Sequence, residues 1–472
     1  MNGRLKKNTY WVSLGQFFQM ALALAVVPVA TRYLGDEKFG VYSLAGALMY
    51  FVFLLNDLGL NTYFTREVAR DLETAPRWFA NALSLKLITV VLSALFLPAI
   101  WLIPSLSGEA RWAIVIFCGY GVLSSFFQLS FALFRAHERM GYETLILAGE
   151  KIITSGIGIA LLVMGYGLQA FCSVFVIGGT LSLALSLVII HKKFFPIRFH
   201  FDRQFAREVL LKALPFGLSM FLVTVYDRVG ILMLTAMTSP EEVGWYAAAY
   251  KLLSLTNLVP MILVTALFPA LSREAALGSD EAARIFTKGL KYLVFLALPM
   301  IAGATLLAEE LVVFMFGADF KNAAPALQIL SWVSGILFLN IFLATLLTAA
   351  NHQKKLLVVQ IAGLLANLGL NYVLISKYSI AGSALASVIT EGLILIFCLL
   401  FALIRVTRLL EFSFIPKAML ATAGMVVFCR FARDYNFLLV LAGATAVYFA
   451  LLYALKGFRF NELLLTHAQA SS

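Results

Sequence analysis

Long apolar stretches follow one another along the whole chain and are separated by short polar segments. An α-helix of about 20 apolar residues spans the hydrocarbon core of a bilayer. With charged residues, prolines and glycine-rich turns taken as boundaries, the pattern predicts fourteen membrane-spanning helices. They begin near residues 10, 39, 78, 110, 142, 168, 214, 244, 290, 324, 356, 380, 414 and 435. A break in the ninth helix is predicted around Glu309 and Glu310.

The composition excludes an ordinary soluble domain. The 472 residues are 61% hydrophobic and only 13% charged, whereas a soluble domain is about half apolar and about a quarter charged. The first apolar stretch, from Tyr10 to Tyr33, is longer than a signal-peptide core and lacks a cleavage pattern, so we expect it to be retained. The predicted fold class is therefore an all-α integral membrane protein.

The cysteines show no pattern typical of a redox or metal site. Cys118, Cys172, Cys398 and Cys429 lie within or at the ends of apolar runs, without CxxC or Cys/His spacing. Cysteine in such surroundings behaves as a small buried apolar residue. We predict no disulfide framework, no metal site and no cofactor.

The distribution of basic residues predicts the topology. Lys and Arg are enriched in the cytoplasmic loops of membrane proteins. If the N-terminus is cytoplasmic, 25 of the 36 Lys and Arg residues fall on the cytoplasmic side and 7 on the opposite side. This bias predicts that both termini are cytoplasmic. It also explains the net charge of +11 without nucleic-acid binding, because no basic soluble domain is present.

One cytoplasmic loop, residues 191–213, is long and basic. It contains His191, Lys192, Lys193, Arg198, Arg203, Arg207 and Lys212. Such clusters beside membrane helices bind anionic lipid headgroups, and we expect these lipids to be partners of the loop. Capture of an anionic substrate is the alternative interpretation.

An internal repeat relates the two parts of the chain on either side of this loop. Glu37, Gly40 and Tyr42 recur with an offset of 204 positions as Glu241, Gly244 and Tyr246. Ala136-His137, at the end of the fourth predicted helix, matches Ala350-Asn351 at the end of the tenth. Because each repeat contains an even number of helices, the repeats are expected to be parallel and related by an axis along the membrane normal.

The repeat predicts a division into two lobes. We expect an N-terminal six-helix lobe over residues 1–190, the basic loop over 191–213, and a C-terminal six-helix lobe over 214–404. Two additional membrane-spanning helices and a cytoplasmic tail occupy 405–472.

Several short patterns resemble a known transporter family. The first half reads Pro28-x-x-x-Arg32-Tyr33-Leu34-Gly35, then Phe39-Gly40-x-Tyr42, Asp57-x-Gly59 and Arg66, and the second half carries Pro215, Asp227 and Val243-Gly244-x-Tyr246. These patterns resemble the polysaccharide transporter family. That family belongs to the superfamily of multidrug and toxin extruders and of lipid-linked peptidoglycan-precursor flippases.

The resemblance implies a function and a location. Members of this family carry undecaprenyl-diphosphate-linked O-antigen, capsule or exopolysaccharide units from the inner to the outer leaflet of the prokaryotic cytoplasmic membrane. They do so by alternating access between two lobes. The resemblance thus implies a lipid-linked oligosaccharide substrate, with a polysaccharide polymerase and glycosyltransferases as possible partners. It does not identify the glycan.

Eight ionisable residues fall within the predicted helices, where charge is costly and therefore marks function. The basic ones, Lys86, Lys151, Arg228 and Lys251, are candidates for binding the diphosphate of the substrate. The acidic ones, Asp57, Glu150, Asp227 and Glu391, are candidates for coupling to H⁺ or Na⁺ or for gating. Pairing between helices is the competing interpretation for each residue.

The spacing of these residues leads to more specific expectations. Adjacent helical positions point about 100° apart, so neither Asp227 with Arg228 nor Glu150 with Lys151 is expected to pair. Counted from the turn that joins their helices, Arg228 and Lys251 differ in depth by only ~3 Å, which predicts a shared anion site.

The neighbourhood of Asp57 gives one further expectation. Asp57 lies near the cytoplasmic end of its helix, where an interaction with the helix end, pairing with Arg66 or a gating role is expected. Lys86 is close enough to the same membrane face for its side chain to reach the headgroups.

Three other functions compete with flipping of a lipid-linked sugar. A cation-coupled antiporter of drugs or metabolites uses the same fold, because fold does not fix substrate. The four basic residues within helices favour an anionic substrate over a cationic drug. A membrane enzyme is disfavoured because the predicted outer loops are too short to hold an active site, and a channel is disfavoured by the duplicated plan.

Overall fold

The structure is a computed structural model that describes residues 2–95, 97–103, 106–257, 260–264, 267, 273, 280–350, 352–405 and 413–457. All regular secondary structure in these ranges is helical, which confirms the predicted all-α class. The predicted tail beyond residue 457 and Asn351 of the repeat lie outside the described residues. The chain forms two compact units, Met1–Gly244 and Trp245–Ser472.

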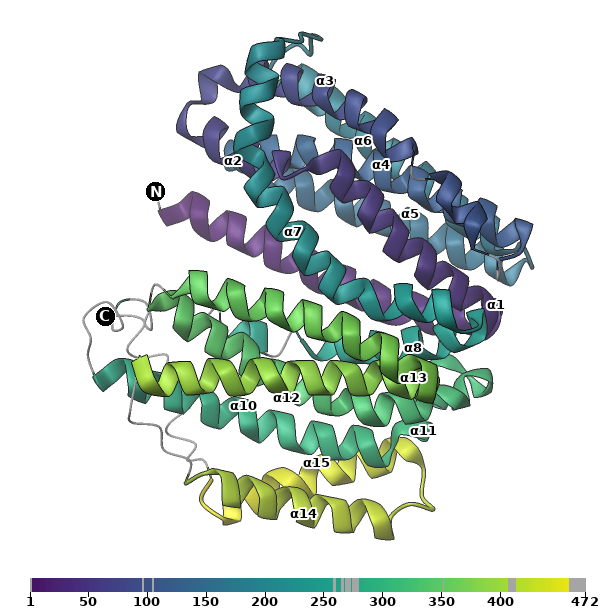
Figure 1. The fold of residues 1–472 in the computed structure, drawn as a ribbon, viewed down its shortest axis with the longest axis vertical. Coiled ribbons are helices and arrows are strands. Elements are labelled where there is room, and N and C mark those ends of the chain that lie inside the picture. Colours follow the sequence, from purple (N-terminus) through teal and green to yellow (C-terminus); the bar gives the residue numbers. More distant parts are fainter. Residues whose placement is uncertain are drawn as a thin grey trace. The chain divides into compact units, whose positions relative to one another are not determined.

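The first unit contains seven α-helices that the structure describes (Figure 1). They are α1 (Asn2–Asp57), α2 (Leu60–Arg70), α3 (Ala75–Ala94), α4 (Gly108–Ala136), α5 (Met140–Val163), α6 (Leu168–Lys193) and α7 (Arg203–Met237). Short 3-10 turns, Leu72–Thr74 and Leu97–Leu102, flank α3. The first residues of α8 (Pro240–Thr256) complete the unit.

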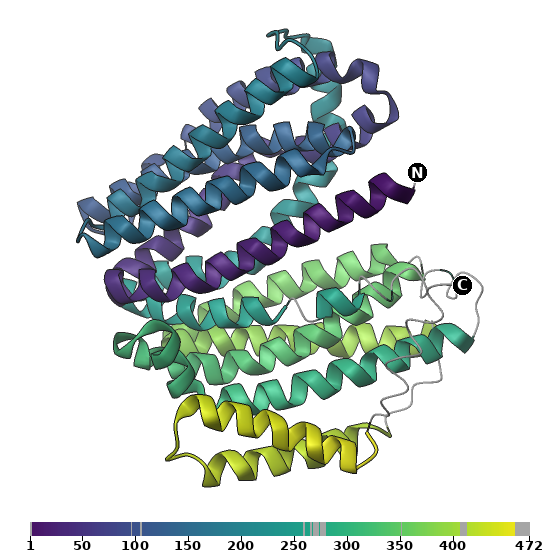
Figure 2. The ribbon, with the colours of Figure 1, turned by 180° about the vertical axis from the view of Figure 1, so that it is seen from behind.

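The second unit continues α8 and adds six labelled α-helices, seen from behind in Figure 2. They are α10 (Asp280–Leu306), α11 (Ala308–Phe316), α12 (Ala324–Ala349), α13 (Gln353–Arg405), α14 (Ile415–Phe431) and α15 (Phe437–Ala454). A 3-10 turn, Ala318–Ala323, precedes α12. The break predicted in the ninth helix is confirmed, because α10 ends at Leu306 and α11 starts at Ala308.

The span count follows from lengths and kinks. Ten helices in the described ranges are long and apolar enough to cross a membrane. Two of the elements contain two predicted spans each, because α1 leaves helical geometry at Gly35 (φ 73°) and α13 does so at Ser379 (φ 49°). The other two predicted spans correspond to α3 (20 residues) and α14 (17 residues), which are not among these ten candidates.

Each unit is built around one central helix. In α4 and in the segment that contains α12, 61% of the most apolar stretch is buried, the highest share among the candidate spans. Helix α4 packs against α1 and α6, and α12 packs against α10 and α13. These two helices are the fourth and tenth predicted spans, whose ends match in the repeat. The equal burial of matching helices supports the duplication.

The last two helices form a hairpin, coloured yellow in Figure 1, that packs on α10. The hydroxyl of Tyr448 in α15 donates a hydrogen bond of 2.7 Å to the carbonyl of Phe295 in α10. This bond satisfies a polar group that would otherwise be buried in apolar surroundings.

Helix α7 belongs to the first unit by packing, although the repeat places it at the start of the second lobe. It contacts α1, α2 and α3. Packing and sequence duplication are different properties, so the lobe boundaries at 190, 213 and 404 stay a prediction. The backbones approach closely at a bend of the second predicted span, where Leu58 and Gly59 have positive φ and face Gly217 of α7.

Candidate functional site

A buried carboxylate in the first unit has the features of an ion-binding group. Glu150 of α5 is 2% exposed. The hydroxyl of Tyr120, from α4, donates a 2.6 Å hydrogen bond to its Oε1. The other oxygen, Oε2, is buried and has no hydrogen-bond partner in the described part of the chain. On the α6 side, Gly178 packs closely on α5, because a Cβ there would lie 2.7 Å from Thr154 Cγ2 and 3.4 Å from Glu150 Cγ.

The neighbouring lysine reaches back to the same carboxylate. Lys151 Nζ lies 3.7 Å from Glu150 Oε1, while its side chain remains 30% exposed. The prediction that Glu150 and Lys151 do not pair is therefore wrong. Although the Cα–Cβ directions of successive helical residues differ by about 100°, the four-carbon lysine side chain is long enough for its ammonium group to approach the neighbouring carboxylate. An oxygen left without a partner in a buried carboxyl group is suited to hold a proton or a small cation.

A second charged group in the first unit is fully paired. Lys86 Nζ of α3 lies 3.0 Å from Asp57 Oδ1 at the end of α1, and both side chains are buried. Lys86 also donates to the carbonyl of Asn56 at 3.3 Å. The side-chain amide of Asn56 in turn donates to Ser93 at 2.9 Å. This network sits next to the bend at Leu58 and Gly59.

The competing interpretation for Lys86, pairing with an acid of another helix, is confirmed. Two other expectations about this pair are wrong. Lys86 does not extend to the headgroups, because its side chain has no exposed surface. Asp57 pairs with Lys86 rather than with Arg66, which lies 3.7 Å from Glu67. The bend after residue 57 directs Asp57 toward α3, and the buried lysine then needs this carboxylate to offset its desolvation.

Arg228 of α7 lies against the second half of α1. Its guanidinium carbon is 5.0 Å from the ring centre of Tyr50, a cation–π distance. Its Nε is 3.1 Å from Asp227 Oδ2, so the prediction that these neighbours do not pair is also wrong. The arginine side chain is 26% exposed.

Lys251 and Glu391 belong to the second unit. Lys251 is half-buried in α8, and Arg228 is in the other unit, so the shared anion site of these two cations stays a prediction. Glu391 of α13 is buried, and its Oε2 accepts a 2.6 Å hydrogen bond from the side-chain amide of Asn340 in α12. Nearby, the amide of Asn367 donates to the hydroxyl of Thr390 at 3.1 Å.

The sequence interpretation missed the uncharged partners of these residues. Tyr120, Tyr50, Asn56 and Asn340 were not predicted, because only side chains that carry a charge marked the candidates. A signal was available, since a tyrosine or asparagine within an apolar helix also needs a polar partner. No group of three or more His, Cys, Asp or Glu residues suited to a metal was found in the ranges that the structure describes.

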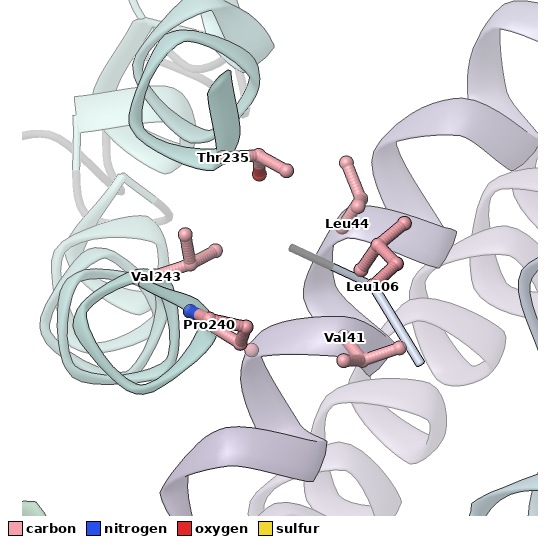
Figure 3. A pocket seen from close by; sticks show the side chains of 7 residues that line it. Val41, Leu44, Leu106, Thr235, Pro240 and Val243 are labelled. Carbon is pink, nitrogen blue, oxygen red and sulfur yellow. The ribbon is translucent and has the colours of Figure 1, made fainter. Parts of the chain in front are cut away.

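A small apolar pocket lies between the second half of α1 and the start of α8 (Figure 3). It is lined by Gly40, Val41, Leu44, Leu106, Thr235, Pro240 and Val243. None of the eight charged candidates lines it, so it offers nothing to an anionic headgroup.

Beside this pocket, the start of the second half of α1 and the start of α8 are in close backbone contact. A Cβ on Gly40 would lie 1.9 Å from the Pro240 carbonyl oxygen, and a Cβ on Gly244 would lie 2.1 Å from that of Asp36. Gly40 and Gly244 are equivalent positions of the internal repeat. Each one lies against the residue that is four positions before the other, Pro240 and Asp36 respectively. Only glycine allows this approach.

Comparison with known proteins identifies the relatives of this chain. A family model described as polysaccharide biosynthesis protein matches residues 5–274, more than half of the chain. A second model, MatE, matches residues 215–373. A protein assigned as an O-antigen transporter in Escherichia coli is 22% identical over 84% of this chain and 96% of its own length.

Two further similarities extend this picture. A protein assigned as a low-salt glycan biosynthesis flippase in Haloferax volcanii is 20% identical over 82% of this chain and 81% of its own length. The solved structure of the lipid II flippase MurJ in an inward closed conformation matches with a TM-score of 0.76 and 16% identity. That match covers 93% of this chain and 97% of the flippase. At this identity the structural match shows a shared fold.

Proposed function

The chain belongs to the polysaccharide biosynthesis protein family, and we propose that it flips a lipid-linked oligosaccharide across a prokaryotic cytoplasmic membrane. The similarity to an O-antigen transporter over 96% of that protein's length carries the proposal. A glycan flippase among the relatives supports the same substrate class. The substrate would be made by glycosyltransferases and passed to a polysaccharide polymerase after transfer from the inner to the outer leaflet.

The diphosphate of such a substrate needs a cation that is accessible within the membrane. Arg228 meets this requirement best in the first unit, because its side chain is partly exposed and is braced by Tyr50 and Asp227. A guanidinium can bind two phosphate oxygens at once. Lys86 is a poor candidate for this role, since it is buried against Asp57. Lys151 is partly exposed and could assist.

Transport against a concentration gradient requires an energy source, and Glu150 is our candidate for the coupling residue. Its unpartnered Oε2 can take up H⁺ or Na⁺, and Tyr120 holds Oε1 in place. Binding of the ion changes the charge next to Lys151. An ion that binds one access state more tightly than the other shifts the equilibrium between them. Glu391, held by Asn340, is the corresponding candidate in the second unit.

The decisive experiment uses the purified protein in liposomes. A labelled undecaprenyl-diphosphate-linked oligosaccharide is placed in the bilayer, and the glycan accessible to an external glycosidase is followed over time. We expect a faster rise than in protein-free liposomes. An unchanged rate with several O-antigen and capsule substrates contradicts the proposal.

A cation-coupled multidrug antiporter is the second candidate function, because the MatE model matches residues 215–373. The same liposomes, loaded with a cationic dye and given a pH or Na⁺ gradient, separate the two functions. Gradient-driven dye transport without glycan flipping favours the antiporter.

A further inference from the structure

The segment that joins α6 to α7 is held firmly against α3. The backbone N–H of Asp202 donates a 2.8 Å hydrogen bond to the side-chain oxygen of Asn81. Arg77 lies 3.0 Å from the Asp202 carboxylate. The hydroxyl of Ser84 donates to the carbonyl of His200 at 3.4 Å. These three contacts fix the end of the segment on one helix.

The start of the segment is fixed by aromatic packing. The ring centre of Phe194 lies 5.7 Å from that of Phe134 in α4. The ring of Phe195 lies 5.9 Å from that of Phe79 in α3. With both ends fastened, residues 194–202 present a defined outer surface rather than a loose loop.

That outer surface combines exposed aromatic and basic side chains. Phe199 is 72% exposed and Phe201 is 47% exposed. Arg198 is the exposed cation within this stretch, and the exposed cations that flank it are Lys192, Lys193, Arg203 and Arg207. We name Phe199, Phe201, Arg198 and Arg203 the aromatic-basic patch.

The acidic residue within this stretch does not weaken the patch. Hydrogen bonds from the Phe205 backbone N–H and from Arg77 hold the pKa of Asp202 below its usual value. Its charge is directed toward Arg77 and toward the N-terminus of α7, where its Oδ1 accepts from the backbone of Gln204 and Phe205. The cations of the patch therefore lack an acidic partner within residues 191–203.

We propose that the aromatic-basic patch docks on the anionic headgroups of the bilayer surface, with Phe199 and Phe201 inserted beside them and Arg198 and Arg203 bound to phosphate. The positive charges of Arg198 and Arg203 are complementary to the negative charges of these headgroups. Apolar rings with flanking cations are typical of segments that lie in the membrane interface.

The experiment places a reporter at the tip of the patch. The full chain carrying Phe199→Trp is reconstituted with brominated phosphatidylglycerol or with brominated phosphatidylcholine. The tryptophan fluorescence of the parent protein is subtracted, so that the signal of the new tryptophan remains. We expect stronger quenching by the anionic lipid. Adding Arg198→Gln and Arg203→Gln should weaken the preference for phosphatidylglycerol by about 30-fold, as expected for the loss of two cations near a charged surface.

A matched control removes the same charge elsewhere. Arg66 and Arg70 are exposed near the end of α2 and lie beside Glu67, so Arg66→Gln with Arg70→Gln should leave the quenching unchanged. Equal quenching by both lipids, or none, overturns the proposal. Release of the quenching by inorganic pyrophosphate at physiological salt also overturns it, because the patch would then be a capture site for diphosphate.

Discussion

At the scale of single residues, the charged groups fall into two kinds. Lys86 and Asp57 are buried and satisfied, whereas Glu150 has one oxygen without a partner among the described residues. The first arrangement suits structure and the second suits exchange of an ion. Burial alone, which both share, does not distinguish these roles.

We predict that Glu150→Gln abolishes ion coupling while leaving the protein folded. The amide keeps the size of the side chain and can accept from Tyr120, but it cannot take up a proton or balance a cation. Flipping in liposomes should lose its dependence on a pH or Na⁺ gradient. Dependence equal to the parent would exclude Glu150 from coupling, and Glu391→Gln then becomes the next variant to examine.

We predict that Lys86→Met destabilises the protein by about 3–5 kcal/mol, because it leaves the Asp57 carboxylate buried without a partner. The double variant Lys86→Met with Asp57→Asn should recover most of this loss. Lys212→Met is the control, since that side chain and its partner Glu208 are both exposed and its removal should cost little stability. Thermal unfolding in detergent measures the stability of all three variants. The pairing would be contradicted if the losses of stability caused by Lys86→Met and Asp57→Asn simply added in the double variant.

We predict that Arg228→Ala prevents glycan flipping without loss of insertion, and that Arg228→Lys restores it poorly. Lysine provides charge but not the planar fork that binds two phosphate oxygens and stacks on Tyr50. Membrane-fraction abundance serves as the control for folding. Flipping by the alanine variant at the parental rate would remove Arg228 from substrate binding.

At the scale of elements, close backbone approaches fix how helices meet. The glycines at the starts of the second half of α1 and of α8 allow contact that any side chain would block. The bend at Leu58 and Gly59 similarly brings the second span against Gly217 of α7.

We predict that Gly40→Ala and Gly244→Ala each destabilise the protein by about 1–3 kcal/mol, the usual cost of overpacking. The new methyl group would meet a backbone carbonyl, which cannot rotate away as a side chain can. Gly119→Ala in α4 is the matched control, because nothing lies within 4 Å of the position that its new methyl group would take. Equal melting temperatures for all three variants would show that the two helix starts separate easily.

At the scale of the whole molecule, orientation in the membrane decides which face receives substrate. We predict that Arg198→Cys reacts with membrane-impermeant maleimide only in inverted vesicles, and that Glu241→Cys reacts only in intact cells or right-side-out vesicles. The four native cysteines are buried, so their background labelling should be low. The reverse pattern would invert the topology drawn from the basic residues.

Much of the fold could be predicted from the chain because membrane insertion depends on local properties. Length and hydrophobicity of each segment predicted fourteen spans, and the acidic pair at Glu309 and Glu310 predicted the break between α10 and α11. The repeat motif also contains Gly40 and Gly244, the two glycines at which the helix starts approach most closely. These features require no knowledge of which helices are neighbours.

The partners of the charged residues were decided only by tertiary structure. Lys86 and Asp57 are 29 residues apart in the sequence, and Tyr120 and Glu150 are 30 residues apart. The periodicity of a single helix cannot predict contacts between residues so far apart, because they lie on different helices. Such pairs depend on how each helix is rotated about its axis and where it bends. The pairs of adjacent residues were misjudged for a related reason, because helix geometry fixes the direction of Cβ but not the reach of a long side chain. Sequence therefore determined which residues carry charge into the membrane, and packing determined which of those charges are paired and how deeply each is buried.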